Sequence, residues 1–142
     1  MTAQEITERI LDCFKRGNKV LIFGNGGSLA DASHFAAEFN NLGPVIALND
    51  PAKITSIGND IRFEAIFSCQ VGDLGKPGDL VVGLSSSGRS INVNYALVCA
   101  KNWGMETIDF PRQGNDTQEV QNFQYQLLHQ IYILVKKHLS RT

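Results

Sequence analysis

A short apolar segment that runs into a glycine-rich turn constrains the fold of this chain most. Residues 21–28 read LIFGNGGS, and Asp31, His34 and Glu38 follow closely. A strand that enters a helix through such a turn directs free backbone N–H groups at an anion, with the helix dipole behind them. Because His34 and Glu38 are four residues apart, both project from one face of the predicted helix. The pattern predicts a phosphate cradle beside two proton-handling side chains, and therefore chemistry on a phosphorylated small molecule.

Length and composition indicate a single globular domain over residues 1–142. Hydrophobic residues make up 43% of the chain and charged residues 19%, and the net charge is −1, which is ordinary for a soluble protein. The basic residues form no stripe, so nothing indicates nucleic-acid binding. No segment has the apolar length of a membrane span and the N-terminus is unlike a signal peptide, so we expect a cytoplasmic protein without membrane contact. The cysteines fit neither a disulfide framework nor a zinc motif and are expected to be buried thiols: Cys13, Cys69 and Cys99.

The alternation of strand and helix patterns predicts an α/β fold, a three-layer α/β/α sandwich around a parallel sheet. Buried strands are expected over 19–23, 45–48, 80–84 and 106–110. Helices are expected over 3–16, 29–41, 62–74 and 117–139, from the turn at 85–90 to Trp103, and briefly from Asp50-Pro51. Ser28 is the predicted N-cap of the second helix. The polar run Gly58-Asn59-Asp60 is predicted to be a non-helical break before the helix at 62–74.

A second polar turn strengthens the prediction of an anion site. Residues 85–90 read SSSGRS and, like the turn at 24–28, follow a strand and precede a helix. The two turns therefore lie at the carboxyl ends of parallel strands, where open α/β sheets bind ligands, and we predict that they face one another. The hydroxyl and N–H groups favour a phosphate-binding site built from uncharged donors. Arg89 either adds positive charge to this site or is a solvated side chain. The alternatives are a plain serine-rich loop and a tight strand-to-helix turn without a ligand.

The pattern alone leaves the ionisable side chains open to two interpretations. His34 and Glu38 fit an ordinary exposed pair on a helix. The glycine turn before them and the flanking Phe35 and Phe39 favour a face partly removed from water, where a carboxylate with a raised pKa serves as a base. On the last predicted helix, His129 lies among apolar residues, which is more typical of a core or interface histidine than of a catalytic one.

Five stretches together resemble the sugar isomerase (SIS) domain family, and within it the phosphoheptose isomerases. They are GNGGSLADASHFAAEF at 24–39, SIGND at 56–60, FxxQVxxLGxPGD at 67–79, GLSSSGRSINV at 83–93 and VQNFQYQLLH at 120–129. The resemblance covers nearly the whole chain. It implies the SIS fold and a ketose–aldose isomerase that converts sedoheptulose 7-phosphate to D-glycero-D-manno-heptose 7-phosphate through an enediol.

The resemblance also implies a role for each matching side chain. Glu38 matches the catalytic base of the family, and His129 matches its catalytic acid. Many members bind zinc, which makes zinc the expected cofactor, and the zinc ligands match His34, Glu38, Gln121 and His129. The substrate and phosphate contacts match Asn25, Gly26, Gly27, Ser28, Asn59, Asp60, Ser85, Ser86, Ser87, Ser90 and Gln121.

The chain also departs from the family pattern. Where residues 40–43 read NNLG, the family has a longer loop with an Arg that reaches the substrate, and between Ile108 and Gln118 it has a further helix and strand. Gln118 itself replaces an acidic residue. These departures favour the alternative of a non-catalytic SIS module that binds a sugar phosphate or a protein partner, as the DnaA initiator-associating protein is. That relative lacks the matching carboxylate and histidine, whereas this chain retains Glu38 and His129, which favours an enzyme.

Spacing on the last predicted helix favours a homo-oligomer. Gln121 and His129 are eight residues apart, so their Cα atoms differ by roughly 12 Å along a continuous helix. They reach one metal only if Gln121 lies in an irregular first turn or if a second subunit completes the site. The helix is also apolar on more faces than one sheet covers: Val120, Phe123, Leu127, Leu128, Ile131, Tyr132, Leu134 and Val135. We expect a tetramer built on this helix, with a dimer as the alternative because the N-terminal helix that helps to hold family tetramers together is missing.

Overall fold

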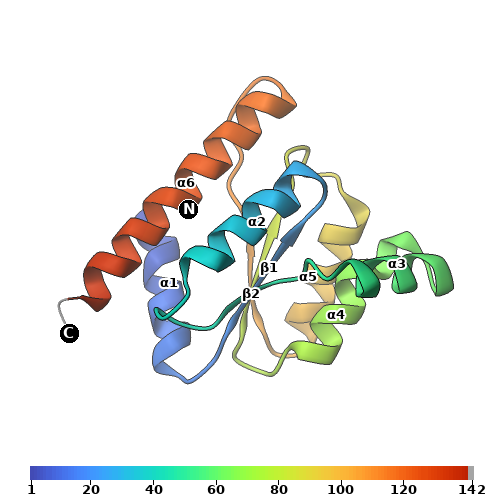
Figure 1. Cartoon of the computed structure of the whole chain (residues 1–142), viewed down its shortest axis with the longest axis horizontal. Helices are drawn as coiled ribbons and strands as arrows, with labels where there is room; N and C mark the ends of the chain where they lie inside the picture. Colours follow the sequence, from blue (N-terminus) through green and yellow to red (C-terminus); the bar gives the residue numbers. More distant parts are fainter. Residues whose placement is uncertain (141–142) are drawn as a thin grey trace.

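A four-stranded parallel sheet lies between two layers of helices in the computed structural model, which describes residues 1–140 (Figure 1). The strands are ordered β2-β1-β3-β4, and every neighbouring pair is parallel. The elements are α1 (Ala3–Lys15), β1 (Val20–Gly24), α2 (Gly27–Glu38), β2 (Val45–Ala47), α3 (Pro51–Asp60), the 3-10 turn η1 (Phe63–Ala65), α4 (Ile66–Leu74), β3 (Leu80–Leu84), α5 (Ile91–Asn102), β4 (Glu106–Asp109) and α6 (Thr117–Leu139). The predicted three-layer α/β/α fold is confirmed.

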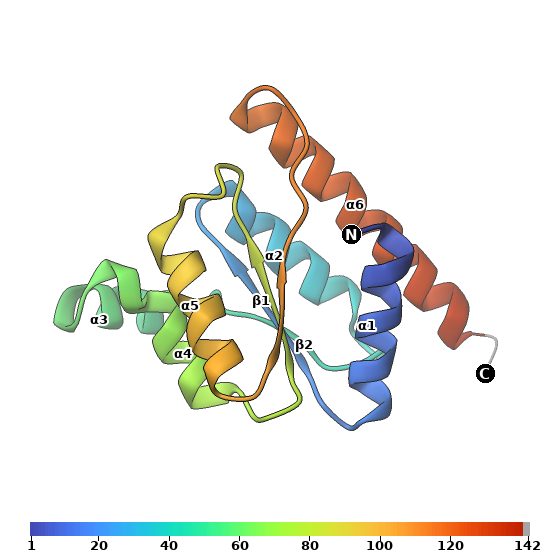
Figure 2. The same cartoon turned by 180° about the vertical axis from the view of Figure 1, so that it is seen from behind.

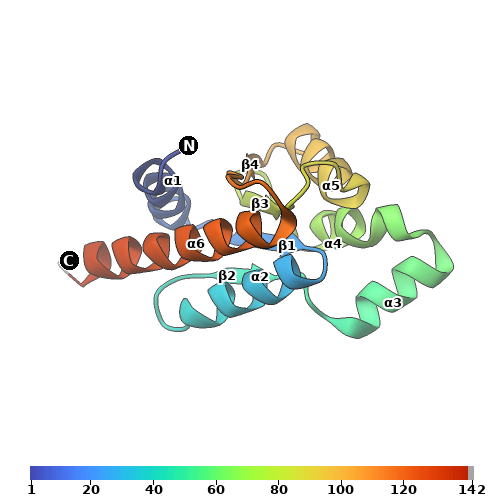
Figure 3. The same cartoon turned by 90° about the horizontal axis from the view of Figure 1, so that it is seen from above.

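The two central strands are buried on both faces, which explains their continuous apolar sequences. In β1, Val20 and Ile22 belong to the core beneath α1, α2 and α6, whereas Leu21 and Phe23 belong to the core beneath α4 and α5. Figures 2 and 3 show the same division, with α1, α2 and α6 on one side of the sheet and α3, α4 and α5 on the other. Each fully buried aliphatic side chain of this kind contributes about 1.5–3 kcal/mol, so the central strands hold the polar turns at their ends in place.

Two local predictions are wrong, and both concern small polar residues. Ser28 is not an N-cap, because α2 begins at Gly27 with Gly26 as its cap, at φ 56° and without a capping side chain. The backbone approaches so closely here that a Cβ on Gly24 would lie 2.7 Å from the Leu84 carbonyl oxygen and from the Ser28 Cβ. Ser28 therefore packs down on the strands instead of turning back to the helix end, and it is 8% exposed.

Residues 58–60 do not form a non-helical break but are the last turn of α3. The Asp50 side chain caps that helix by accepting the Ala52 N–H, and Pro51 occupies the first helical position. A glycine inside a helix lowers helix stability by only about 1 kcal/mol relative to alanine. The capped N-terminus offsets this cost, and the helix continues through Gly58. The predicted helix at 62–74 is divided into η1 and α4.

Helix α6 packs along α1 and α2 (Figure 3). These two helices cover most of the side chains that one sheet was expected to leave open, so that argument for an oligomer is wrong. Buried within the single chain are Val120, Leu127, Leu128, Ile131 and Val135. Among residues 1–140, no helix is long and apolar enough to cross a membrane.

Candidate active site

The two polar turns lie side by side at the carboxyl edge of the sheet, as predicted. Strands β1 and β3 pair directly, with Gly24 opposite Leu84, so both turns leave the sheet at the same level. Asn25 of the first turn and the buried Asn92 of α5 exchange two hydrogen bonds. Asn25 Nδ2 donates to Asn92 Oδ1 at 2.8 Å, and Asn92 Nδ2 donates to Asn25 Oδ1 at 3.0 Å. This reciprocal amide pair joins the first polar turn to the first turn of α5, so the N-termini of α2 and α5 lie close together.

The serine turn folds around the buried Ser85 hydroxyl. Ser85 Oγ lies 3.2 Å from Ser90 Oγ and 3.5 Å from Ser87 Oγ, and it accepts the Gly88 N–H at 3.0 Å. Ser87 Oγ accepts the Arg89 N–H at 3.0 Å. The hydroxyl groups therefore converge on one another, in an arrangement where anion oxygens can replace hydroxyl–hydroxyl contacts without any backbone change.

Glu38 lies between two imidazole rings that come from two helices. Glu38 Oε1 is 3.3 Å from His34 Nε2, and Glu38 Oε2 is 4.0 Å from His129 Nδ1. The Glu38 side chain is 20% exposed, whereas about half of each imidazole remains accessible. The structure thus brings together the carboxylate and the histidine that the family resemblance assigns to the base and the acid.

These groups form one end of a polar seam between α2 and α6, which run in the same direction (Figure 3). At the other end, Gln121 lies so close to Gly27 that a Cβ there would overlap its carboxamide, and it hydrogen-bonds the Asp31 carboxylate. Burial raises the pKa of Asp31, and the nearby His34 and the Gln121 hydrogen bond partly oppose that rise. The seam therefore places Gln121 beside the first polar turn, two helical turns from the acid–base end.

A hollow of about 370 Å³ opens at the Gln121 end of this seam. Its lining is polar and comes from both helices: Asp31, Gln118, Gln121, Asn122 and Tyr125. Gln118, where the family pattern has an acid, thus faces the same space as Asp31.

The expected zinc ligands supply suitable donor chemistry but are not gathered around one point. Zinc prefers four donors in a tetrahedron at about 2.0–2.2 Å for nitrogen and oxygen. Within residues 1–140, no three His, Cys, Asp or Glu side chains are arranged to hold a metal ion. Gln121 lies in the regular part of α6, which begins at Thr117, so the irregular-turn explanation for its spacing from His129 is wrong. The four residues do not fit zinc in this arrangement of a single chain.

Asn59 and Asp60 are not brought to the two turns. They end α3, which packs on α4 and η1, and Asn59 Nδ2 donates to Asp60 Oδ1 at 3.0 Å. The other predicted contact residues lie in or next to the polar turns: Asn25, Gly26, Gly27, Ser28, Ser85, Ser86, Ser87, Ser90 and Gln121.

Two side chains that sequence reasoning missed also lie at this edge, namely Asn92 and Arg112. Arg112 follows β4, and its guanidinium forms two hydrogen bonds with Asp109, which raise its pKa. Nothing in the local pattern around Arg112 predicts its position, because the turn that it contacts lies more than twenty residues earlier.

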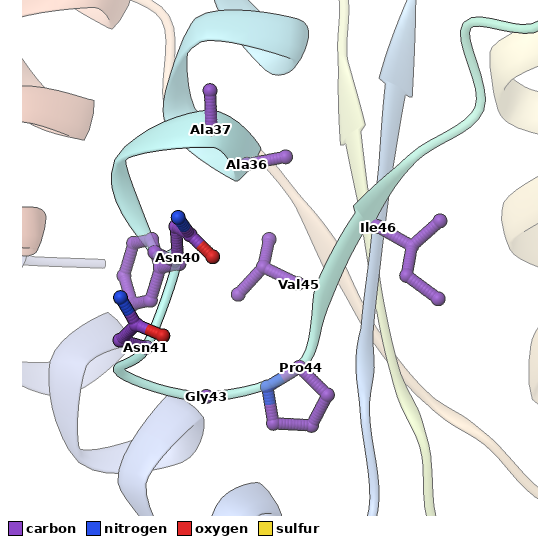
Figure 4. A pocket seen from close by; sticks show the side chains of 9 residues that line it. Ala36, Ala37, Asn40, Asn41, Gly43, Pro44, Val45 and Ile46 are labelled. Carbon is purple, nitrogen blue, oxygen red and sulfur yellow. The ribbon is translucent and has the colours of Figure 1, made fainter.

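A larger hollow of about 460 Å³ lies elsewhere, at the amino end of the edge strand β2 (Figure 4). It is lined by Ala36, Ala37, Phe39, Asn40, Asn41, Gly43, Pro44, Val45 and Ile46. None of these side chains is ionisable, so the polar edge together with the seam between α2 and α6, and not the larger hollow, is the candidate active site.

Comparison with known proteins identifies the family. The SIS domain family model matches residues 3–110. The phosphoheptose isomerase of Trichlorobacter lovleyi is 43% identical over an alignment covering 95% of this chain and 81% of that protein. The chain belongs to the phosphoheptose isomerase family. The solved phosphoheptose isomerase GmhA from Neisseria gonorrhoeae superposes with a TM-score of 0.91 at 33% identity, covering 95% of this chain and 85% of that one.

The chain is shorter than its relatives within the matched region. The alignment with the T. lovleyi protein runs over 159 positions, more than the 142 residues present here. The phosphoheptose isomerase of Synechocystis is 48% identical, and the alignment covers 74% of this chain but only 58% of that protein. The SIS match also ends at Phe110, so Gln121 and His129 belong to the part of the chain that lies beyond it.

Proposed function

We propose that this phosphoheptose isomerase relative interconverts sedoheptulose 7-phosphate and D-glycero-D-manno-heptose 7-phosphate. The observation that carries the proposal is the seam between α2 and α6. It holds Glu38 between His34 and His129 at one end and meets the paired polar turns at the other. Names of relatives at 43% and 48% identity support the same reaction.

The reaction needs a base that moves one proton between adjacent carbons. In the proposed mechanism, Glu38 removes a proton from C1 of the ketose, and an enediol forms as the C2 carbonyl oxygen is protonated. Glu38 then returns the proton to C2 while the C1 hydroxyl loses its proton and becomes the aldehyde. His129 exchanges the protons at the two oxygens, so no proton is gained or lost overall. The polar turns bind the phosphate and supply binding energy remote from the reacting carbons.

Zinc binding by His34, Glu38, Gln121 and His129, with a second subunit completing the site, is a separate proposal on which no step above depends. Elemental analysis of the purified protein tests it directly. Retention of about one zinc per chain after gel filtration, lost in His34→Ala, is the supporting result.

We also propose a homo-oligomer, with a tetramer favoured over a dimer, and a cytoplasmic location. Support for association now comes from α5 instead of α6. Its outer face carries Ile91, Tyr95 and Val98, all exposed and spaced as one helical stripe. Analytical ultracentrifugation at micromolar concentration decides the state, and a stable active monomer contradicts the proposal.

Turnover of sedoheptulose 7-phosphate by the purified full chain tests the function. The aldose product is measured with added zinc and with a chelator, and Glu38→Gln serves as the control. Binding of the sugar phosphate without turnover in either condition favours the non-catalytic SIS module instead.

A further inference from the structure

Arg112 holds a positive charge against the serine turn at 85–90, and neither the family resemblance nor the proposed mechanism assigns it a role. A Cβ on Gly88 would lie 2.9 Å from both Cζ and Nε of Arg112. The turn is itself fixed at this point, because the Gly88 N–H donates to Ser85 and the Gly88 carbonyl accepts from Asn94 Nδ2 at 3.2 Å. The guanidinium therefore packs on the part of the turn where the serine hydroxyl groups converge.

Asp109 orients this guanidinium. Arg112 Nη1 donates to Asp109 Oδ1 at 2.7 Å, and Nη2 donates to Oδ2 at 2.9 Å. Asp109 ends β4 and is in register with Gly83 of β3, so the carboxylate is anchored in the sheet. The bidentate pair uses two of the five N–H donors of arginine. The Nε–H has no hydrogen-bond partner among the residues that the structure describes.

We propose that Arg112 binds the phosphate group of the substrate and adds the positive charge that the serine turn lacks. This inference rests on the proposed function for the identity of the ligand, a phosphorylated sugar. The turn offers hydroxyl and N–H donors, whereas a phosphate carries a charge of about −2 at neutral pH. An arginine already held by a carboxylate loses little side-chain entropy when it binds an anion, which increases affinity.

Arg89 is the alternative cation, because it lies in the turn itself. Its backbone N–H is held by Ser87 Oγ, but its side chain is exposed, and within residues 1–140 no hydrogen bond or ion pair holds its guanidinium. Arg112 comes instead from the short connection between β4 and α6, and its two bonds to Asp109 hold it beside Gly88. The geometry favours Arg112.

The test compares four variants by steady-state kinetics and by calorimetric titration with inorganic phosphate. Arg112→Gln is expected to raise the KM for sedoheptulose 7-phosphate and the Kd for phosphate about 10- to 100-fold, with kcat changed less than about threefold. Arg112→Lys is expected to lie between this variant and the wild type. Arg9→Gln is the matched control, since Arg9 pairs with Glu106 at the opposite end of β4, and it leaves both constants unchanged. Arg89→Gln tests the alternative cation.

The outcomes separate this inference from the proposed function. An unchanged KM and phosphate Kd in Arg112→Gln, or a loss of affinity in Arg89→Gln alone, overturns the role of Arg112 even when the wild type turns over normally. A wild type that binds phosphate without turnover overturns the proposed function, and the Kd of the variant still decides on Arg112. A wild type that neither binds phosphate nor turns over the sugar phosphate overturns both. Thermal unfolding checks that Arg112→Gln is folded, and if it is not, Asp109→Asn loosens the guanidinium and is expected to raise the same constants by a smaller factor.

Discussion

The two ends of the sheet use polar residues in opposite ways. At the amino end, Asp79 is buried and accepts four hydrogen bonds between 2.7 and 3.1 Å. Their donors are Asn18 Nδ2, the Lys19 N–H, Lys19 Nζ and the Lys76 N–H. At the carboxyl end, the serine hydroxyl groups contact mainly one another. Donors and acceptors are fully paired at one end and loosely paired at the other.

Full pairing stabilises a fold, whereas loose pairing leaves groups available to a ligand. Burial alone would raise the pKa of Asp79, but the hydrogen bonds from Lys19 and Asn18 and from two backbone N–H groups outweigh it and lower that pKa. Gln124, by contrast, sits in the core beneath the serine turn with its Oε1 unpartnered among residues 1–140. If this division is correct, substitutions at the two ends affect different observables.

The largest expected effect is on turnover, from Glu38→Gln in the seam that leads away from the carboxyl end. Gln keeps the volume and an acceptor oxygen but does not take a proton, so kcat falls by about 10²- to 10⁴-fold. The free energy of unfolding, measured with urea, changes by less than about 0.5 kcal/mol because the side chain is partly exposed. Turnover near the wild-type rate removes Glu38 from the role of base.

Asp79→Ala at the amino end is expected to do the reverse. It leaves the Lys19 ammonium and two backbone N–H groups without their acceptor, which costs about 3 kcal/mol of unfolding free energy. The kcat of the folded fraction stays at the wild-type value, because Asp79 is hydrogen-bonded to Asn18, Lys19 and Lys76 and to no residue of the seam between α2 and α6. An Asp79→Ala variant that is as stable as the wild type but has a lower kcat contradicts this division between the two ends of the sheet.

The stabilisation by Asp79 is also expected to depend on pH. Its folded-state pKa lies below the unfolded value of about 3.9, so its contribution is complete above that value and is lost as pH falls through the folded-state pKa. Urea unfolding of the wild type and of Asp79→Asn at a series of pH values checks this. Their stability difference shrinks below about pH 4, and a difference that is constant down to pH 2 contradicts the assignment.

Elements that depend on local sequence were predictable, and contacts between distant segments were not. The bounds of β3 and α6 match the predicted 80–84 and 117–139, since a continuous apolar run specifies β3 and apolar residues at helical spacing specify α6. The two polar turns were found because each follows a buried strand. Asn92 and Arg112 were missed because their roles depend on partners that the folded sheet alone brings near.

The expected zinc ligands show the same limit of prediction from sequence. The residues matched to zinc ligands were chosen by family pattern, and the structure separates Gln121 from His129 along α6. Sequence spacing already indicated this distance. It did not indicate that Gln121 would instead pair with Asp31, because that contact depends on how α2 and α6 pack.

Asn92→Ala is expected to have a moderate effect at the carboxyl end. It removes both hydrogen bonds that join the first polar turn to the start of α5, directly after the serine turn, and leaves the Asn25 carboxamide unpaired, costing about 1–3 kcal/mol of unfolding free energy. Because the turns are no longer held together, the KM for the sugar phosphate rises severalfold, by about the factor that one hydrogen bond supplies. Lys101→Ala, at an exposed position in the last turn of α5, is a control that leaves KM unchanged. An unaltered KM in Asn92→Ala shows that the turns are positioned by the strands alone.

Gln124→Leu is expected to have the smallest effect on stability, although Gln124 is as buried as Asp79. Its Nε2 donates to the Ser85 and Pro111 carbonyls at 3.3 and 3.1 Å, and losing two such bonds costs about 1–3 kcal/mol. The same substitution removes the buried, unpartnered Oε1, which relieves a cost of similar size, and leucine adds buried apolar surface. The free energy of unfolding, measured with urea, is therefore expected to change by less than about 1 kcal/mol, compared with about 3 kcal/mol for Asp79→Ala. A loss as large as that of Asp79→Ala means that Oε1 has a partner in solution, such as a bound water, and that this part of the carboxyl end is paired as completely as the amino end.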